Sequence, residues 1–448
     1  MTQKCVHPDP TPAAESPGTT APPPKADMSS RTADGRLLSH SVRALRNRDF
    51  ALFWSGALVS NTGNWLSNLT VPYVLFQLTG SALWTGLASL AQFAPQMLLT
   101  PLAGTLADRL DRRRFLVLTQ VLMALAALGL WATWMFIAQP RSDAYALLAL
   151  VAVSGVLQGL NLPSWQAFVN DLVPRTDLRS AITLNSVQFN ASRSLGPAIA
   201  GAILAAFGPS VAFAVNAGSF VFVIIALLAV RLRLARPARR PRKETGFLPA
   251  LAYVRREPGI MMAIGISFLI GVLANPILQF SVIFAETVFR VGPVSLGLLN
   301  ASFGLGSVLA APLIAGSVWR RASITRVGLL MQGGGLLTFA LAPNVYVAMA
   351  ALLVMGAGFL ASISCAITAL QMIVTEAFRG RVIAVRIMIY SASFPIGALI
   401  QTALADQLGP RPVVSVAGAL LIATGLLVTW GRPARALARL DDDNGDAV

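Results

Sequence analysis

The sequence has few of the residues from which catalytic and metal sites are usually built. Among 448 residues it contains two cysteines, Cys5 and Cys365, and two histidines, His7 and His40. Two cysteines so far apart provide neither a disulfide framework nor metal-ligand spacing. The chain also lacks a G-x-x-x-x-G-K-[ST] phosphate-binding loop and a pair of histidines spaced to share one face of a helix. No apolar segment contains a Ser/His/Asp set. We therefore expect no enzyme active site, no metal and no cofactor.

Charged residues are scarce as well. They make up 12% of the chain, whereas hydrophobic residues make up 55%, and the mean hydropathy is +0.66. This composition excludes an ordinary soluble globular protein. The apolar residues fall into about twelve runs, each long enough to cross the ~30 Å hydrocarbon core of a bilayer as a helix. We expect an all-α integral membrane protein with spans at 49–77, 82–107, 115–138, 144–171, 180–206, 210–230, 259–287, 294–318, 323–342, 345–374, 381–407 and 411–431.

Positive charge is plentiful but occurs in alternate connections between the spans. The net charge is +16, from 35 basic and 19 acidic residues. With the N-terminus in the cytoplasm, 29 basic residues lie in connections or flanking segments on the cytoplasmic side, among them 379–386, and the outer connections contain only Arg141, Arg290 and Arg411. This alternation follows the positive-inside rule and places both termini in the cytoplasm. Charge spread over short loops argues against a nucleic-acid partner.

Changes in composition divide the chain into five parts. These are a tail at 1–40, a six-helix bundle at 41–230, a linker at 231–258, a second six-helix bundle at 259–431 and a tail at 432–448. The first tail is rich in Pro, Thr, Ser and Ala and has no apolar signal-peptide region, which predicts a disordered cytoplasmic segment. The linker is basic, and Phe247–Val254 fits a short amphipathic helix on the membrane surface. Gly86-Leu87 recurs as Gly297-Leu298 at corresponding places in the two bundles, which indicates duplication.

The connection between the second and third spans contains the most specific motif. It reads Gly104-Thr-Leu-Ala-Asp108-Arg109-Leu-Asp-Arg112-Arg113-Arg114. It resembles the G-x-x-x-D-[RK]-x-G-[RK]-[RK] loop signature of the major facilitator superfamily, with Asp111 in place of the second glycine. The resemblance implies a conformational switch, in which Gly104 allows close helix packing and Asp108 holds a helix N-terminus or an arginine of the other bundle. The arginines would bind lipid phosphates. An ordinary positive-inside loop is the alternative.

The fifth span contains the second motif, Gly196-Pro197-Ala-Ile-Ala-Gly201. It resembles the G-P-x-x-G-G motif that exporters of the superfamily have in this helix. Pro197 removes a backbone donor and kinks the helix, while Gly196 and Gly201 permit close packing against a neighbour. The resemblance implies that this segment hinders a leak through the outward side. An ordinary kinked helix is the alternative.

Within the superfamily, the chain is similar to the branch that contains the enterobactin exporter and macrolide efflux proteins. The similarity rests on the opening Leu45-Arg46-Asn47-Arg48-Asp49-Phe50 and on Leu162-Pro163, Trp165-Gln166-Ala167, Asp171, Pro174-Arg175 and Leu184-Asn185-Ser186. This resemblance implies export of a moderately large amphipathic molecule from the cytoplasm.

Arg193 is the most unusual residue of the expected spans. It lies near mid-depth in the fifth span, where an unpaired guanidinium costs roughly 2.5–3.5 kcal/mol or more. Arginine cannot relieve this cost by losing its proton. Either Arg193 faces a central cavity, or it ties helices together through backbone carbonyls or an asparagine. The sequence leaves both interpretations open.

Amides and one tryptophan at similar depth are further candidates for a cavity lining. They are Asn61, Asn64, Trp65, Asn68, Gln92, Gln158, Asn161, Asn275 and Gln279. The three asparagines of the first span share one helical face. Such amides also hold membrane helices together, which is the alternative. The candidates for proton coupling are Asp171, Glu286 and Asp406, which alternatively are interfacial residues or ties between helices.

We therefore expect a secondary active transporter with two six-helix halves around a central cavity, in the cytoplasmic (inner) membrane of a bacterium. It would export a small amphipathic compound, such as a drug, antibiotic, siderophore or related metabolite, by alternating access. The expected partners are this substrate, protons in antiport and membrane lipids, and the expected state is a monomer. An uptake permease of the same fold is the first alternative, and a receptor or assembly factor without transport is the second.

Overall fold

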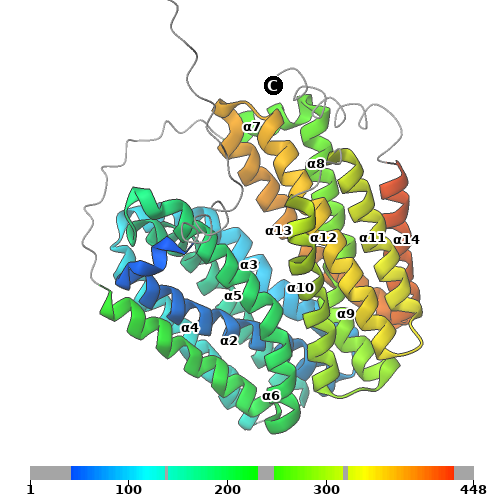
Figure 1. The fold of residues 1–448 in the computed structure, drawn as a ribbon. Coiled ribbons are helices and arrows are strands. Elements are labelled where there is room, and N and C mark those ends of the chain that lie inside the picture. Colours follow the sequence, from blue (N-terminus) through cyan, green and yellow to red (C-terminus); the bar gives the residue numbers. More distant parts are fainter. Residues whose placement is uncertain (1–41, 137–139, 231–246, 316–320, 428–448) are drawn as a thin grey trace, which may run out of the picture. The chain divides into compact units, whose positions relative to one another are not determined.

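The computed structural model describes residues 42–136, 140–230, 247–315 and 321–427. The chain divides into two units, Met1–His40 and Ser41–Val448, and all described residues belong to the second. They form long helices joined by short connections (Figure 1). Both expected tails and most of the expected basic linker lie outside the described residues.

The long helices follow the expected spans closely. The N-terminal helices are α2 (Arg48–Thr79), α3 (Ala82–Arg109), α4 (Arg112–Met135), α5 (Pro140–Asp171) and α6 (Leu178–Ala229). A short helix, α7 (Phe247–Arg256), occupies the place of the expected amphipathic segment. The C-terminal helices are α8 (Pro258–Leu269), α9 (Ile277–Ile283), α10 (Pro293–Ala315), α11 (Arg321–Leu341), α12 (Val345–Ile373), α13 (Glu376–Leu408) and α14 (Pro410–Leu427).

Nine helical segments of the described residues are long and apolar enough to cross a membrane. One of them contains α6, which is interrupted at Gly208, where a φ of 76° is followed by Pro209. Glycine tolerates that positive φ, and the proline cannot donate a backbone hydrogen bond, so the two expected spans separate here. Because α2 and α3 also have the length of spans, the helices are consistent with twelve crossings.

The expected seventh span is less regular than its apolar sequence suggests. It consists of α8, the π-helical turn η3 (Ile270–Ala274), α9 and the π-helical turn η4 (Phe284–Phe289). Such wide turns leave backbone carbonyls without their usual helical partners, which is costly in lipid. Pro276 has no N–H to donate to the carbonyl of Val272 four residues earlier, and Gln401 of α13 supplies a donor there, since its Nε2 lies 2.6 Å from this carbonyl oxygen.

The connections between helices lie at two ends of the helical unit. One end contains the turns at Gly80, Gly208 and Gly409 and is called the Gly80 end. The other contains the turns at Asp111 and Pro174 and is called the Asp111 end. The depth of a residue in the helical unit is its position between the Gly80 end and the Asp111 end.

The hydrophobic core differs between these ends. Toward the Gly80 end, one cluster contains both N-terminal and C-terminal helices, including Leu75 and Phe213 with Phe284 and Phe339. Toward the Asp111 end, the N-terminal helices have a cluster around Phe168, and the C-terminal helices have a separate one that includes Val254, Leu370 and Val382. The two groups of helices therefore share a core at one end and have separate cores at the other.

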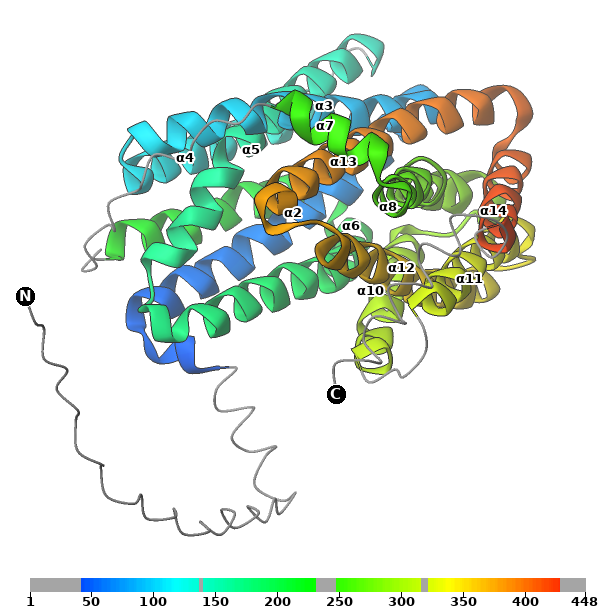
Figure 2. The same cartoon turned by 90° about the horizontal axis from the view of Figure 1, so that it is seen from above.

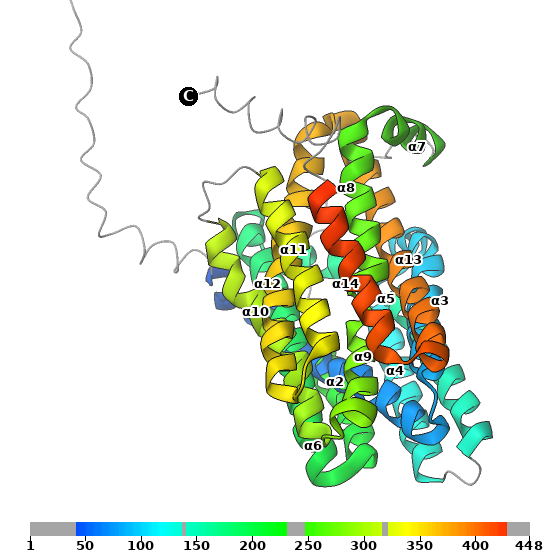
Figure 3. The same ribbon diagram turned by 90° about the vertical axis from the view of Figure 1, so that its right-hand side faces the viewer.

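Two helix pairs make the most extensive contacts between the groups. The first pair is α3 with α13, which lie side by side in Figure 3, and the second is α6 with α10. Figure 2 shows α2 along α6 within the N-terminal group. At the second pair Gly201 faces Gly297 so closely that a Cβ on Gly297 would lie 2.6 Å from the Pro197 carbonyl oxygen and 2.8 Å from Gly201 Cα. Backbone approaches backbone here, so no larger residue fits.

Substitution of Gly297 by alanine tests this contact. The added methyl group must push α6 and α10 apart, and overpacking of this kind costs about 1–3 kcal/mol. We expect a lower melting temperature for the purified Gly297→Ala protein in detergent. The matched control is Gly218→Ala, because nothing lies within 4 Å of a Cβ at this exposed helical position. The packing argument is wrong if both variants melt at the wild-type temperature.

Candidate functional site

Asp406 connects the two groups of helices at the Gly80 end. Its carboxylate, on α13, accepts hydrogen bonds from Ser81 Oγ and from the backbone N–H groups of Ala82 and Leu83, at 2.6 and 3.1 Å for the latter two. These N–H groups belong to the first turn of α3, whose positive helix end favours an anion. This expected proton-coupling residue therefore caps a helix of the other group, and its coupling role stays a prediction.

A second polar contact between the groups lies nearby. Gln279 of α9 is buried, and its Nε2 donates to Ser89 Oγ of α3 at 2.6 Å. Glu286, another proton-coupling candidate, is half-buried in η4, within electrostatic range of Tyr73 on α2. Both residues come from the irregular seventh span, so the π-helical turns lie where the two groups meet.

The Gly-Pro segment of α6 packs on both groups. A Cβ on Gly196 would lie 2.4 Å from Trp65 Cβ on α2, and Gly201 faces α10 as described above. Pro197 is buried inside α6, with its carbonyl oxygen at Gly297. The segment therefore fixes α6 between one helix of its own group and one of the other.

Arg193, one turn before this segment, is surrounded by aromatic rings. Its Cζ lies 5.2 Å from the ring centroid of Phe359, 5.6 Å from that of Phe303 and 6.0 Å from that of Trp65. These distances are within the range of cation–π attraction. Within the described part of the chain, the guanidinium has no hydrogen-bond or ion-pair partner. The expected tie through backbone carbonyls or an asparagine is therefore not observed among these residues.

The position of Arg386 differs from the expectation, which placed this residue in a cytoplasmic connection. It lies inside α13 and is 7% exposed. Its Nε donates to Ser267 Oγ at 3.1 Å, and its Nη2 is buried without a partner among the described residues. The available signal was its position within the expected span 381–407, directly before Ile387-Met388-Ile389.

Tyr390, one turn after Arg386, is a second residue that the sequence analysis missed. Its ring centroid is 5.8 Å from Arg386 Cζ. Asn275, an expected cavity residue, donates from Nδ2 to the Tyr390 hydroxyl at 2.9 Å. No sequence pattern singles out Tyr390, Phe303 or Phe359, because their importance follows from the packing of distant helices.

The remaining amides do not form one common lining. A small cavity of about 20 Å³, room for about one water molecule, lies within the N-terminal group, and its polar lining is Asn64, Ser67, Asn68, Gln92, Ser154, Gln158 and Asn216. Asn161 instead ties α5 to α4, because its Oδ1 accepts a hydrogen bond from Thr119 Oγ1 at 3.0 Å. Asn61 is half-buried one turn before Trp65.

The loop motif ties the N-terminal helices together at the Asp111 end. Arg112 Nη1 lies 2.6 Å from Asp171 Oδ2, so this proton-coupling candidate is part of an ion pair between α4 and α5. Arg113 donates to the carbonyls of Leu227 and Leu228 at the end of α6, a favourable position for a cation.

The turn between α3 and α4 shows what replaces the second glycine of the motif. The Asp111 carboxylate accepts the N–H of Arg114 at 2.9 Å and caps the start of α4. Gly104, Asp108 and Arg109 lie in the last turns of α3, but the side chains of Asp108 and Arg109 are outside the described part of the structure, and the switch function stays a prediction.

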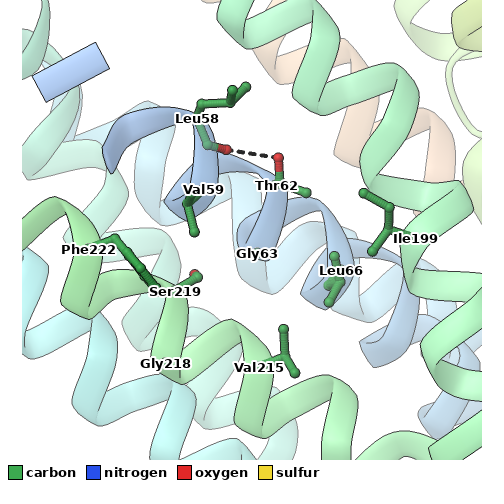
Figure 4. A pocket seen from close by; sticks show the side chains of 10 residues that line it. All are labelled: Leu58, Val59, Thr62, Gly63, Leu66, Ile199, Val215, Gly218, Ser219 and Phe222. Atoms are coloured by element: carbon green, nitrogen blue, oxygen red, sulfur yellow. Dashed lines mark hydrogen bonds between the residues drawn. The ribbon is translucent and has the colours of Figure 1, made fainter. Parts of the chain in front are cut away.

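An apolar groove of about 450 Å³ runs between α2 and both segments of α6 (Figure 4). Its lining is Leu58, Val59, Thr62, Gly63, Leu66, Ile199, Val215, Gly218, Ser219 and Phe222. Thr62 Oγ1 donates to the Leu58 carbonyl at 2.8 Å, so little hydrogen-bonding capacity faces the groove. A hydrocarbon chain would suit this surface.

Removal of the Asp406 carboxylate should favour separation at the Gly80 end. Loss of a helix cap costs about 0.5–2 kcal/mol, so the population separated at this end should rise about two- to thirtyfold in Asp406→Ala. Asp406→Asn retains one acceptor oxygen and should lie between wild type and alanine. Spin labels at Phe136 and Tyr346, both exposed at this end, would report the distance distribution in a background without native cysteines. Gln407→Ala is the control, and an unchanged distribution in Asp406→Ala contradicts the capping role.

Comparison with known proteins identifies the chain's relatives. A family model described as transmembrane secretion effector matches residues 39–441. The "Uncharacterized MFS-type transporter YfiS" of Bacillus subtilis (strain 168) is 26% identical over 391 residues, which covers 84% of this chain and 91% of the relative. "Macrolide efflux protein A" of Streptococcus pyogenes is 21% identical over 387 residues, which covers 84% and 94%.

Solved structures show the same architecture. A crystal structure of peptide transporter POT superposes with a TM-score of 0.70 at 15% identity and covers 88% of this chain and 96% of that one. The fold is therefore the major facilitator fold, as the loop motif and the helix pattern predicted. With the family match extending over most of its length, the chain belongs to the transmembrane secretion effector family of major facilitator transporters.

Proposed function

We propose that the chain exports a small amphipathic compound from the cytoplasm across the cytoplasmic membrane by alternating access, in exchange for protons. The observation that carries this proposal is the unequal core, which is shared at the Gly80 end and separate at the Asp111 end. The positive-inside pattern assigns the Asp111 end to the cytoplasm. In this state the two groups separate toward the cytoplasm, where an exporter takes up its substrate.

The Gly-Pro segment of α6 supports the direction of transport. Its glycine contact with Gly297 lies on the side where the two groups share a core. A contact of backbone against backbone leaves no space for solute or water between α6 and α10. The segment would therefore seal the outer side while substrate binds from the cytoplasm.

We assign proton binding to Asp406 and Glu286, which lie toward the outer side in this orientation. A protonated carboxyl group accepts fewer hydrogen bonds than a carboxylate. Proton binding at Asp406 would therefore weaken its cap on α3, so the contact between the two groups at the outer side would depend on pH. Asp171, in its ion pair with Arg112, remains a candidate at the cytoplasmic side.

Accumulation of fluorescent compounds tests the export function. Cells that produce the protein should accumulate less of at least one dye from a panel of anionic, neutral and cationic amphipathic dyes than cells with an empty vector. Cells that produce Gly297→Ala at equal membrane abundance should lose most of this difference, because α6 and α10 cannot close. Higher accumulation would indicate uptake instead, and equal accumulation of every dye would argue against transport.

Inside-out membrane vesicles test the coupling. A lumen more acidic than the medium should drive accumulation of the dye. Nigericin with potassium, which collapses the pH gradient, should lower the initial rate and, with one coupled proton at ~1.4 kcal/mol per pH unit, lower the steady-state accumulation ratio about tenfold for each pH unit lost. A rate that does not depend on the gradient excludes proton antiport.

A further inference from the structure

Two guanidinium groups lie deep within the spans without an acidic partner. Arg193 is on α6 in the N-terminal group, and Arg386 is on α13 in the C-terminal group. Among the described residues neither forms an ion pair. The carboxylates nearest the membrane segments are engaged elsewhere or lie at helix ends, as shown by Asp171 and Asp406. Two permanent cations therefore remain uncompensated in a low-dielectric region, which is costly.

Tyr390 lies near both cations. Its ring contacts Arg386, and it lies within electrostatic range of Arg193 as well. The Tyr390 hydroxyl already accepts a hydrogen bond from Asn275 Nδ2, so its own hydrogen is free to donate. The unpartnered Nη2 of Arg386 is a further donor. All these groups can donate hydrogen bonds, which suits an acceptor with negative charge.

The surroundings of Arg193 add an apolar surface to these donors. Trp65, Phe303 and Phe359 present three ring systems around its guanidinium, from α2, α10 and α12. Rings bind planar or apolar groups, and the guanidinium between them favours an adjacent acidic group. A cationic ligand would meet two like charges here, with no carboxylate among the described residues at this depth.

We propose that the exported compound is an organic anion, whose carboxylate binds between Arg193 and Arg386 beside the Tyr390 hydroxyl. Its aromatic or apolar part lies against Trp65, Phe303 and Phe359. This substrate class rests on the export function proposed above. It distinguishes the chain from a pump for lipophilic cations, because two guanidinium groups would repel a cationic ligand at this depth.

Three probes that share one ring system test the proposal. They are the carboxylate of 2-naphthylacetic acid (called naphthylacetate below), 2-(2-naphthyl)ethanol (naphthylethanol) and 2-(2-naphthyl)ethylamine. Near pH 7 these are anionic, neutral and cationic. Isothermal titration to the full-length protein in lipid nanodiscs measures binding without transport. We expect the carboxylate to bind about tenfold or more tightly than the alcohol, because charged hydrogen bonds are the stronger ones, and the amine to bind most weakly.

Substitutions at the two arginines test the assignment of residues. Arg193→Gln and Arg386→Gln should each lower the affinity for naphthylacetate about tenfold or more, with little effect on naphthylethanol. Arg386→Lys should retain part of the preference because it retains the charge. The matched control is Arg381→Gln, since Arg381 is also on α13 and contacts a ring, that of Phe378 at 5.2 Å, near the start of the helix. It should leave all three affinities unchanged.

Binding of the three probes to the wild-type protein is sufficient to contradict the proposal, whether or not the variants fold. Equal binding of the three probes, preferred binding of the amine, or no binding of naphthylacetate would each contradict an anion site. If naphthylacetate binds as expected but no dye is exported from cells, the anion site stands and the export function fails. If a dye is exported but the carboxylate preference is absent, the export function stands and the substrate class is wrong.

Discussion

Lipid hydrocarbon solvates neither a charge nor a backbone amide, and this constraint governs the interior of the helical unit. In the seventh span Pro276 leaves the carbonyl of Val272 without a backbone donor, and Gln401 donates to it. Asn161 accepts a hydrogen bond from Thr119, and Gln279 donates one to Ser89 from Nε2, although its Oε1 has no partner among the described residues. The two arginines differ from such amides because an uncompensated guanidinium is a permanent charge, which costs more in a low-dielectric region than an unpaired neutral group.

The same constraint explains why small residues lie where the two groups of helices meet. Without water to expel, membrane helices associate through close packing. Gly86 of α3 faces Thr402 and the Ala398 carbonyl of α13, and Gly297 of α10 faces Gly201 and the Pro197 carbonyl of α6. Gly86 and Gly297 are corresponding residues of the sequence duplication. The duplication thus supplies one glycine to each of the two contacts that join the groups, which gives the interface its approximate symmetry.

Much of the fold could be predicted because bilayer thickness and loop charge act on each segment separately. The break at Gly208-Pro209 and the bounds of most spans follow from local sequence. The π-helical turns of the seventh span could not be predicted from its apolar sequence, and neither could the donor to the Val272 carbonyl, because Gln401 is more than a hundred residues away. Asp406 was identified as a functional candidate, but its capping of α3 required the packed structure, as did the rings around Arg193. Arg386 was misassigned because charge in a loop and charge in the first turns of a span look alike in sequence.

The proposed anion site also relates binding to conformational change. Arg193 belongs to the N-terminal group and Arg386 to the C-terminal group, so their mutual repulsion opposes approach of the groups on the cytoplasmic side of the shared core. A bound carboxylate replaces this repulsion with attraction to both sides. The occupied transporter would then close toward the cytoplasm more readily than the empty one. Closure in turn strains the contacts of Asp406 and Gly297 at the opposite end, where a proton weakens the cap on α3. Substrate charge at one depth and proton charge at another would thereby act on opposite ends of the same two groups of helices, so both binding events bear on one conformational equilibrium.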